Sequence, residues 1–339
     1  MAGNQVKGHL KRRDGWTTLA ADGKSHATIK KISQKKVRML PRLLVRAGVI
    51  GFIVAIVTLL IKRQQENTQP PSPHKEARLE SSAPRQTAVK PTVQILGKYP
   101  HDTTAFTQGF TILNRGSATF FVESTGLYGQ SALRLVAPDT GKVLKQFKLP
   151  ENLFGEGVTF GSKDELVMLT WKSKTGLVFD LQKNEDGKTD GFILKREFTF
   201  DTTTSEGWGI TFDGENYVVS DGSWTLIFWD PMTMKEVRRI DVTTRSGVQK
   251  IAHINELEYA KGFIYANVWY QPYIVKIDPV TGIVITVFNL SNVIADAGVD
   301  VNAGAVLNGI IYNEVEDVFY ITGKLWKNVY KVHLIDSGQ

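Results

Sequence analysis

From Val93 onward, short apolar and β-branched runs alternate with turns rich in glycine, aspartate and threonine. No part of this region keeps a 3.6-residue apolar period for long, so the pattern argues against helices. Short runs of β-forming residues between turn signals are typical of strands. The pattern therefore predicts an all-β domain over residues 93–339.

The strand pattern repeats along the domain. Each repeat opens with small or polar residues and an apolar strand that ends in an aromatic residue. These aromatic landmarks are Phe110, Phe160, Phe212, Tyr259 and Tyr312, and they stand 47 to 53 residues apart. Second, third and fourth strands follow the landmark in most repeats. Four strands in a repeat of about 50 residues predict one blade of a β-propeller.

The fifth repeat ends after its third strand, at the segment VYKVHL. A matching fourth strand, VQILGKYP, precedes the first repeat. A strand borrowed from the N-terminal side would close the ring and leave no open sheet edge. We therefore expect a five-bladed propeller of four-stranded blades, closed by residues around Val93 to Tyr99.

A different pattern precedes the domain. The run LLVRAGVIGFIVAIVTLLI, within residues 43–62, is almost wholly apolar and about as long as a bilayer-spanning helix. A helix of the folded domain is the alternative, most simply a buried core helix. The run is too uniformly apolar for a half-exposed helix, and its flanks suit a membrane anchor. Residues 63–92 are polar and proline-bearing, which indicates a flexible linker. The expected organisation is a tail (1–42), a transmembrane signal anchor (43–62), a linker (63–92) and the propeller (93–339).

Charge sets the expected orientation of this anchor. The net charge is +7, yet before Ala47 twelve lysines and arginines face only Asp14 and Asp22. The positive-inside rule places this basic tail in the cytosol. The sequence thus predicts a single-pass type II membrane protein with a lumenal or extracellular propeller in the secretory pathway. Because the excess charge belongs to the tail, it gives no case for nucleic-acid binding by the propeller.

Composition narrows the chemistry further. The chain has no cysteine, which excludes disulfides, thiolate nucleophiles and cysteine-ligated metals. Its six histidines show no metal-ligand spacing. We expect no cofactor for catalysis, although a structural cation in the propeller channel is compatible with the fold.

The start of each first strand and the end of each second strand should open onto one face of the propeller, the channel mouth. Four residues before the landmarks stand Phe106, Glu156, Trp208, Asn255 and Asn308, and the second strands end near Glu123, Trp171, Asp221, Trp269 and Lys324. Two residues before the landmarks, Gln108 is the lone polar member. A few polar groups among aromatic side chains are typical of a small-molecule site. Glu123 is more easily explained by a structural role in its turn.

Several stretches resemble the plant-type glutaminyl cyclases, a group also found in bacteria. They are HDTTAFTQGF, ESTGLYGQSALR, FGEGVTF, GWGITFDG, SDGSWTL, NELEYAKGFIYANVW and GKLW, in the family's order over residues 93–335. The resemblance implies a glutaminyl-peptide cyclotransferase, an aminoacyl-class acyltransferase that converts N-terminal glutamine to pyroglutamate and releases ammonia. It also implies a proton-transferring Glu156 in a pocket with Phe106, Gln108, Phe154, Trp171, Trp208, Asn255, Trp269 and Lys324.

These residue types suit that reaction. The substrate's own α-amine attacks its γ-carboxamide, so no enzyme nucleophile is needed. Three indoles can hold the glutamine in its folded conformer, and one carboxylate can accept and return the proton. Lys324 and Asn255 are candidate donors to the oxyanion, and Gln108 could hold the substrate amide. The expected partners are peptides or proteins with N-terminal glutamine and, through residues 43–62, a membrane; we expect a monomeric catalytic domain.

Two other functions fit the same fold. One is a non-catalytic propeller that binds peptides or proteins. The other is a metal-dependent hydrolase or lactonase, which needs several oxygen ligands around one cation. A cation beside Lys324 would be disfavoured, so the second alternative ranks lower.

Overall fold

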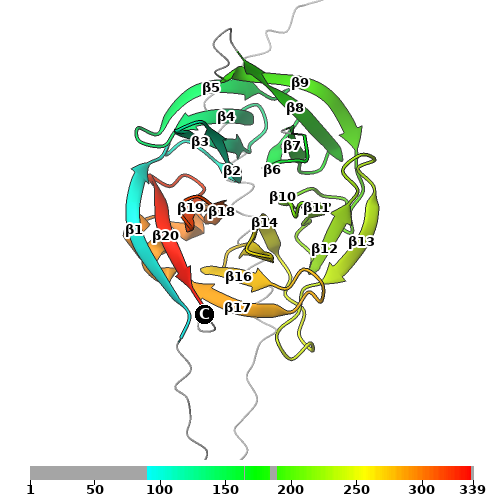
Figure 1. The fold of residues 1–339 in the computed structure, drawn as a ribbon, viewed down its shortest axis with the longest axis vertical. Coiled ribbons are helices and arrows are strands. Elements are labelled where there is room, and N and C mark those ends of the chain that lie inside the picture. Colours follow the sequence, from blue (N-terminus) through cyan, green and yellow to red (C-terminus); the bar gives the residue numbers. More distant parts are fainter. Residues whose placement is uncertain (1–89, 164, 184–188, 337–339) are drawn as a thin grey trace, which may run out of the picture. The chain divides into compact units, whose positions relative to one another are not determined.

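The computed structural model describes residues 90–336, apart from 164 and 184–188. These residues form five four-stranded antiparallel sheets around a central axis (Figure 1). The five-bladed all-β prediction is therefore confirmed. The predicted tail, the anchor at 43–62 and most of the linker lie outside the described residues.

The blades follow one another in sequence order, and each runs from an inner first strand to an outer fourth strand. Blade 1 comprises β2 (Thr107–Arg115), β3 (Ala118–Thr125), β4 (Ala132–Ala137) and β5 (Lys142–Lys148). Blade 2 comprises β6 (Gly155–Phe160), β7 (Leu166–Thr170), β8 (Thr175–Lys183) and β9 (Thr189–Thr199). Blade 3 comprises β10 (Ile210–Phe212), β11 (Tyr217–Val219), β12 (Thr225–Trp229) and β13 (Glu236–Asp241). Blade 4 comprises β14 (Ile254–Ala260), β15 (Phe263–Val268), β16 (Tyr273–Ile277) and β17 (Val284–Asn289).

Blade 5 closes the ring as predicted. It comprises β18 (Leu307–Asn313), β19 (Val318–Gly323), β20 (Asn328–Ile335) and, as its outer strand, β1 (Thr92–Pro100). β1 pairs antiparallel with β20, from Thr92 opposite Ile335 to Pro100 opposite Asn328. Figure 1 shows the two strands side by side, although they come from opposite ends of the domain.

Burial explains which sequences occupy which strand. The middle strands β7 and β12 are buried at every position, because neighbouring blades cover both faces of the sheet. The outer strand β5 contains only exposed and half-buried residues, since its edge faces solvent. Core clusters fill the spaces between adjacent blades; one joins Leu133 and Leu135 of blade 1 to Leu166 and Phe179 of blade 2.

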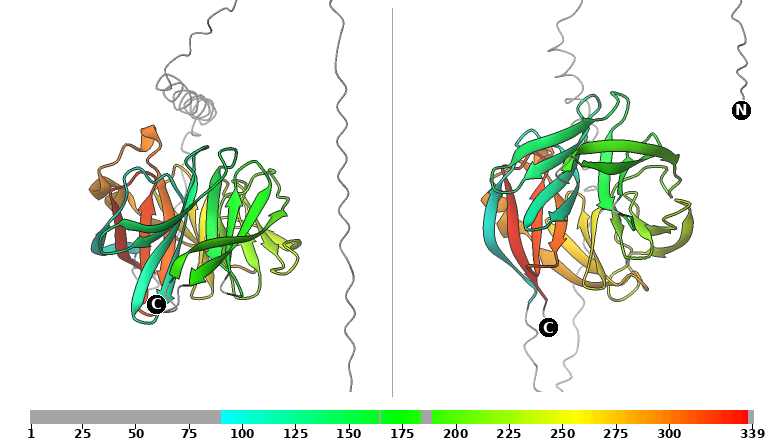
Figure 2. Two further views of the ribbon diagram at one scale, coloured as in Figure 1. Left: turned by 90° about the horizontal axis from the view of Figure 1, so that it is seen from above. Right: turned by 45° about the horizontal axis from the view of Figure 1, so that its top comes forward.

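The connection from blade 4 to blade 5 contains the helical structure among the described residues. It forms α2 (Ser291–Ala297) and the short 3-10 helix η1 (Val301–Ala303), which the sequence patterns do not predict. Figure 2 shows the orange segment with α2 projecting from one end of the propeller. Within the described part of the chain, the structure has no helix with the length and hydrophobicity needed to cross a bilayer.

Candidate active site

The five first strands β2, β6, β10, β14 and β18 lie closest to the axis, and neighbouring first strands contact one another (Figure 1). Glycine allows this close approach. A Cβ at Gly157 would lie 2.6 Å from the carbonyl oxygen of Trp208, and the Gly157 N–H donates to the same oxygen at 2.7 Å. The residue before this glycine is Glu156, so the strand contact fixes Glu156 at the channel wall.

Equivalent positions in the five blades form two layers at the mouth. The inner layer contains Gln108, Glu156, Trp208, Asn255 and Asn308. The outer layer lies two residues earlier in the chain, just before each first strand, and contains Phe106, Phe154, Glu206, His253 and Val306. Backbone bonds establish the equivalence, since Gly126, Trp171, Trp269 and Lys324 donate to the carbonyls of Phe106, Phe154, His253 and Val306.

The layers correct the predicted register of blade 1. The first strands bulge at equivalent places, between Thr107 and Gly109 in blade 1 and between Gly155 and Val158 in blade 2. Gln108 is therefore the counterpart of Glu156, and Phe106 is the counterpart of Phe154. The prediction used Phe110 as the blade 1 landmark, but Ile112 holds that place. An aromatic residue two positions early misled the sequence comparison.

Two predicted members of the second-strand ring do not reach the mouth. Glu123 is buried where it accepts hydrogen bonds from His101 Nε2 at 2.9 Å and Thr107 Oγ1 at 2.7 Å, with Arg134 Nη1 at 3.3 Å. Its pKa falls below the usual range, because His101 and the arginine outweigh the effect of burial. Asp221 accepts hydrogen bonds from Ser223 Oγ in its own loop and from the Thr204 main-chain N–H at 2.9 Å in the connection between β9 and β10. Both residues are structural.

Glu156 is the buried carboxylate of the inner layer, with 4% of its surface exposed. Gln108 Nε2 donates to Glu156 Oε1 at 2.9 Å, and the Ser124 hydroxyl donates to the Glu156 main-chain oxygen. Burial raises the pKa of Glu156 well above its ordinary value. Lys324 opposes this rise and Glu206 adds to it. The protonated form of this carboxyl group is thus favoured more strongly than in an exposed glutamate.

Lys324 supplies the cation of the site. Its side chain is buried, and Nζ lies 4.7 Å from the centre of the Phe106 ring. Burial lowers its pKa to about 8, while Glu156 acts in the opposite direction. At neutral pH the protonated, positively charged form of Lys324 therefore predominates.

Aromatic side chains surround this pair. Phe154 packs edge-on to Phe106 at 6.3 Å between ring centres and lies 5.4 Å from Trp171. Across the mouth, Trp208 and Trp269 lie 5.5 Å apart at 81°. The three indoles are half-buried, so each still has open surface at the mouth.

Glu206 is a functional candidate that the sequence comparison missed. One of its oxygens, Oε2, accepts a hydrogen bond from Trp171 Nε1 at 2.7 Å and from Trp208 Nε1 at 2.9 Å. It thereby fixes two of the three indoles. The sequence did contain a signal for Glu206: it stands two residues before Trp208, just as Phe154 stands two residues before Glu156.

Carboxamides complete the inner layer. Asn255 is buried, and its Oδ1 has no hydrogen-bond partner among the described residues. Asn308 Nδ2 donates to the main-chain oxygens of Thr107 and Gln108 at 3.1 and 3.2 Å, which leaves its Oδ1 without a described partner. Asn308 therefore braces blade 1 through Nδ2, and the Oδ1 atoms of both side chains can accept a hydrogen bond from another polar group.

Further along the channel, a second carboxylate has a structural role. Glu256 occupies the position that is glycine in the other four first strands. It accepts hydrogen bonds from the main-chain N–H groups of Phe110 at 3.1 Å and Ile310 at 2.9 Å. Burial raises its pKa well above the ordinary value. Glu256 thus links blade 4 to blades 1 and 5 below the mouth.

The site therefore brings together all nine predicted residues: Phe106, Gln108, Phe154, Glu156, Trp171, Trp208, Asn255, Trp269 and Lys324. The arrangement can hold a small polar group between indoles, move one proton and stabilise a negative oxygen. Among the described residues, no three histidine or acidic side chains gather as a metal site would require.

Comparison with known proteins identifies the family to which this chain is similar. The model of the glutamine cyclotransferase family matches residues 70–334. A curated glutaminyl-peptide cyclotransferase from Arabidopsis thaliana is 35% identical over 248 residues, which cover 71% of this chain and 71% of that protein. The crystal structure of Myxococcus xanthus glutaminyl cyclase matches with a TM-score of 0.63 and 31% identity, over 73% of this chain and 99% of the other.

Proposed function

Because the chain belongs to the glutamine cyclotransferase family, we propose that it converts the N-terminal glutamine of peptides or proteins to pyroglutamate, with release of ammonia. The observation that supports this most strongly is the buried Glu156 in an indole-walled mouth, with Gln108 and Lys324 beside it. The family indicates the reaction, and the side chains at the channel mouth are suited to each of its steps.

The first step is to fold the substrate side chain. The reaction joins the α-amino nitrogen to the side-chain carbonyl carbon of the same residue, so its entropic barrier depends on holding a bent conformer. Trp171, Trp208 and Trp269 form the cage for this conformer. Glu206 preorganises two of the cage indoles through their N–H groups.

Glu156 then moves the proton. Its carboxylate accepts a proton from the attacking amine as the new C–N bond forms. It returns that proton to the side-chain amide nitrogen as the old C–N bond breaks, so ammonia leaves and the lactam remains. A carboxyl group whose pKa is raised by burial is matched to both halves of this transfer.

Negative charge develops on the carbonyl oxygen between these events. The Lys324 ammonium and the Asn255 carboxamide are the donors in reach of the mouth, and a donor in a water-poor site stabilises such an oxygen strongly. Gln108 holds Glu156 in place through one hydrogen bond, and the rest of its carboxamide is available to hydrogen-bond the substrate amide. This mechanism requires no cofactor; a structural cation in the channel is compatible with it.

Ammonia release from a short glutamine-initiated peptide tests the proposal, with the wild-type chain and Glu156→Gln assayed in the presence of a chelator. We expect turnover by the wild-type chain and a loss of at least about 10²-fold in kcat for the variant. Circular dichroism and thermal unfolding would check that both proteins are folded. A folded wild-type chain that turns over none of several such peptides would contradict the proposal and favour a binding propeller.

The apolar run at 43–62 and the basic residues before it support a second part of the proposal. We infer a type II anchor that leaves the catalytic propeller lumenal or extracellular, tethered by residues 63–92. The propeller is proposed to act as a monomer. Membrane partitioning, described in the Discussion, tests the anchor.

A further inference from the structure

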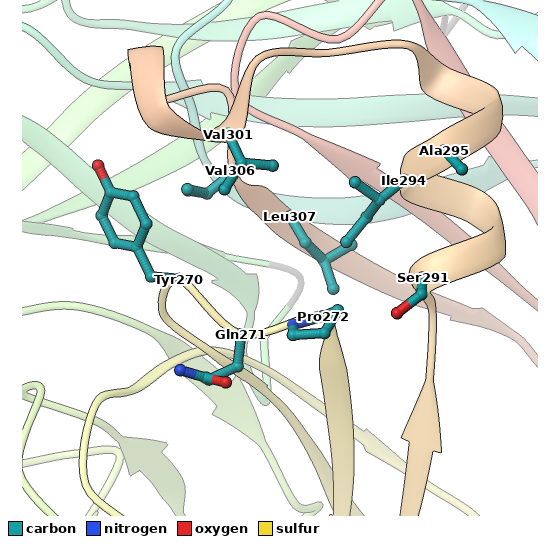
Figure 3. A pocket seen from close by; sticks show the side chains of 9 residues that line it. All are labelled: Tyr270, Gln271, Pro272, Ser291, Ile294, Ala295, Val301, Val306 and Leu307. Carbon is teal, nitrogen blue, oxygen red and sulfur yellow. The ribbon is translucent and has the colours of Figure 1, made fainter. Parts of the chain in front are cut away.

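A second cavity lies beside the candidate active site, under the connection that carries α2. Its volume is about 340 Å³, and we call it the α2 pocket. It is lined by Tyr270, Gln271, Pro272, Ser291, Ile294, Ala295, Val301, Val306 and Leu307 (Figure 3). This volume lies at the lower end of the range for small-ligand sites.

The α2 pocket shares its wall with the active site. Tyr270 directly follows the cage residue Trp269, and their ring centres lie 4.8 Å apart. Val306 accepts the main-chain N–H of Lys324 at 2.9 Å. Leu307, which lines the pocket, directly precedes Asn308 of the inner layer in β18. The pocket and the mouth are therefore built from adjoining residues of the same three stretches of backbone, and Val306 belongs to both.

The lining indicates what the α2 pocket would bind. In Figure 3, Ile294, Val301, Val306 and Leu307 converge on the cavity, and Pro272 completes the apolar wall. Polar atoms come from Tyr270, Gln271 and Ser291, and none of the nine lining residues carries a charge. Such a surface favours an aliphatic or aromatic side chain over a charged one.

We propose that the α2 pocket binds a large apolar side chain at the second or third position of the peptide substrate. The inference rests on the proposed function. If the glutamine enters the cage, the rest of the peptide must leave over the mouth, where the wall of Trp269 and Tyr270 leads to the pocket. An extended chain advances about 3.3 Å per residue, so the next two side chains are those that pass this wall.

Three peptides and two variants test the proposal: Gln-Leu-Gly-Gly, Gln-Gly-Leu-Gly and Gln-Gly-Gly-Gly, each with the full-length protein. We expect the wild-type chain to prefer at least one leucine peptide over the all-glycine peptide by about tenfold in kcat/KM, the effect of filling an apolar subsite. Ala295→Phe would fill the pocket from an exposed position of α2 and bring this ratio close to one.

Ala303→Phe is the matched control. It makes the same change at an exposed residue of the same connection that does not line the pocket. It should keep the wild-type preference and the wild-type turnover of all three peptides. Thermal unfolding of both variants would identify a folding defect, and the wild-type preference is a readout independent of either variant.

The outcomes are distinguishable. Equal kcat/KM for all three peptides with the wild-type chain would overturn the pocket proposal and leave the cyclotransferase activity intact. A preference that survives in Ala295→Phe would also overturn it, and would leave the α2 pocket to another occupant such as a partner protein. If the wild-type chain turned over none of the peptides, the proposed function and this inference would both fall.

Discussion

At the scale of single residues, the charge around Glu156 sets its readiness to exchange protons. Burial and Glu206 raise its pKa, and Lys324 lowers it. Two of these influences come from side chains that also touch the cage or its aromatic wall. Electrostatics and substrate positioning are therefore coupled in this mouth, and a change at one residue should appear in both.

Replacing Glu206 by glutamine should shift the acid limb of the kcat/KM pH profile to lower pH. The variant removes a negative charge that raises the pKa of Glu156, so Glu156 ionises at lower pH. The glutamine oxygen can still accept from the indoles. Glu215→Gln is the control, because it removes the same charge from an exposed turn of blade 3. Superimposable profiles for Glu206→Gln and the wild-type chain would show that Glu206 has no influence on Glu156.

Glu258 should make stability depend on pH. Burial raises its pKa to about 8 from an ordinary 4.5, although its carboxylate accepts the Tyr312 N–H at 2.8 Å. Between these values the folded state holds a proton that the unfolded state has lost, so the free energy of unfolding falls as pH rises. The glutamine of Glu258→Gln does not ionise, so this contribution to the pH dependence is absent from the variant. Its thermal midpoint, relative to the wild-type chain, should therefore be higher at pH 9 than at pH 5. An unchanged difference at the two pH values would contradict the expectation.

The candidate site could be predicted residue by residue only where a pattern repeats. Glu156, Trp208, Asn255 and Asn308 fall at one spacing from their landmarks, and the structure places them in one layer. Gln108 stood out as the lone polar residue two positions before a landmark, but its layer was misassigned because Phe110 resembles a landmark. Glu206 was missed because its partners are the indole N–H groups of two blades, which depend on three-dimensional packing.

At the scale of elements, the first strands depend on glycine where they approach the axis. Gly157→Ala should destabilise the propeller by about 1–3 kcal/mol, the usual cost of overpacking, because the added carbon meets the Trp208 carbonyl and the Ile210 nitrogen. Gly97→Ala in β1 is the control, since a Cβ there meets nothing within 4 Å. Urea unfolding of both variants would measure the difference. Equal stabilities would show that the strands can separate without cost.

The strands themselves were predictable because each needs only a local pattern. Four apolar runs between turns recur in sequence, and neighbouring blades bury them. The α2 connection was not predictable in the same way. Seven residues of helix give too short a period to recognise, and the shape of the α2 pocket depends on how that helix meets blade 4.

At the scale of the whole molecule, the proposed anchor should decide where the enzyme is found. The full-length chain should remain with membranes after an alkaline carbonate wash, and a variant lacking residues 43–62 should appear in the soluble fraction with its kcat unchanged. Protease protection of the propeller in intact microsomes would report the lumenal orientation. Release of the full-length chain by the wash would contradict a spanning anchor.

The closing pair of β1 and β20 also constrains how the chain can fold. The two strands are separated by the entire set of blades, so the pair is among the least local contacts in the domain. Contacts between distant segments form slowly, because the intervening chain must first be ordered. During synthesis β1 emerges before any blade and must wait, unpaired, until β20 has been made. The step that completes the enzyme is therefore the last one available to the chain, and chaperones that shield an open strand would act during this interval.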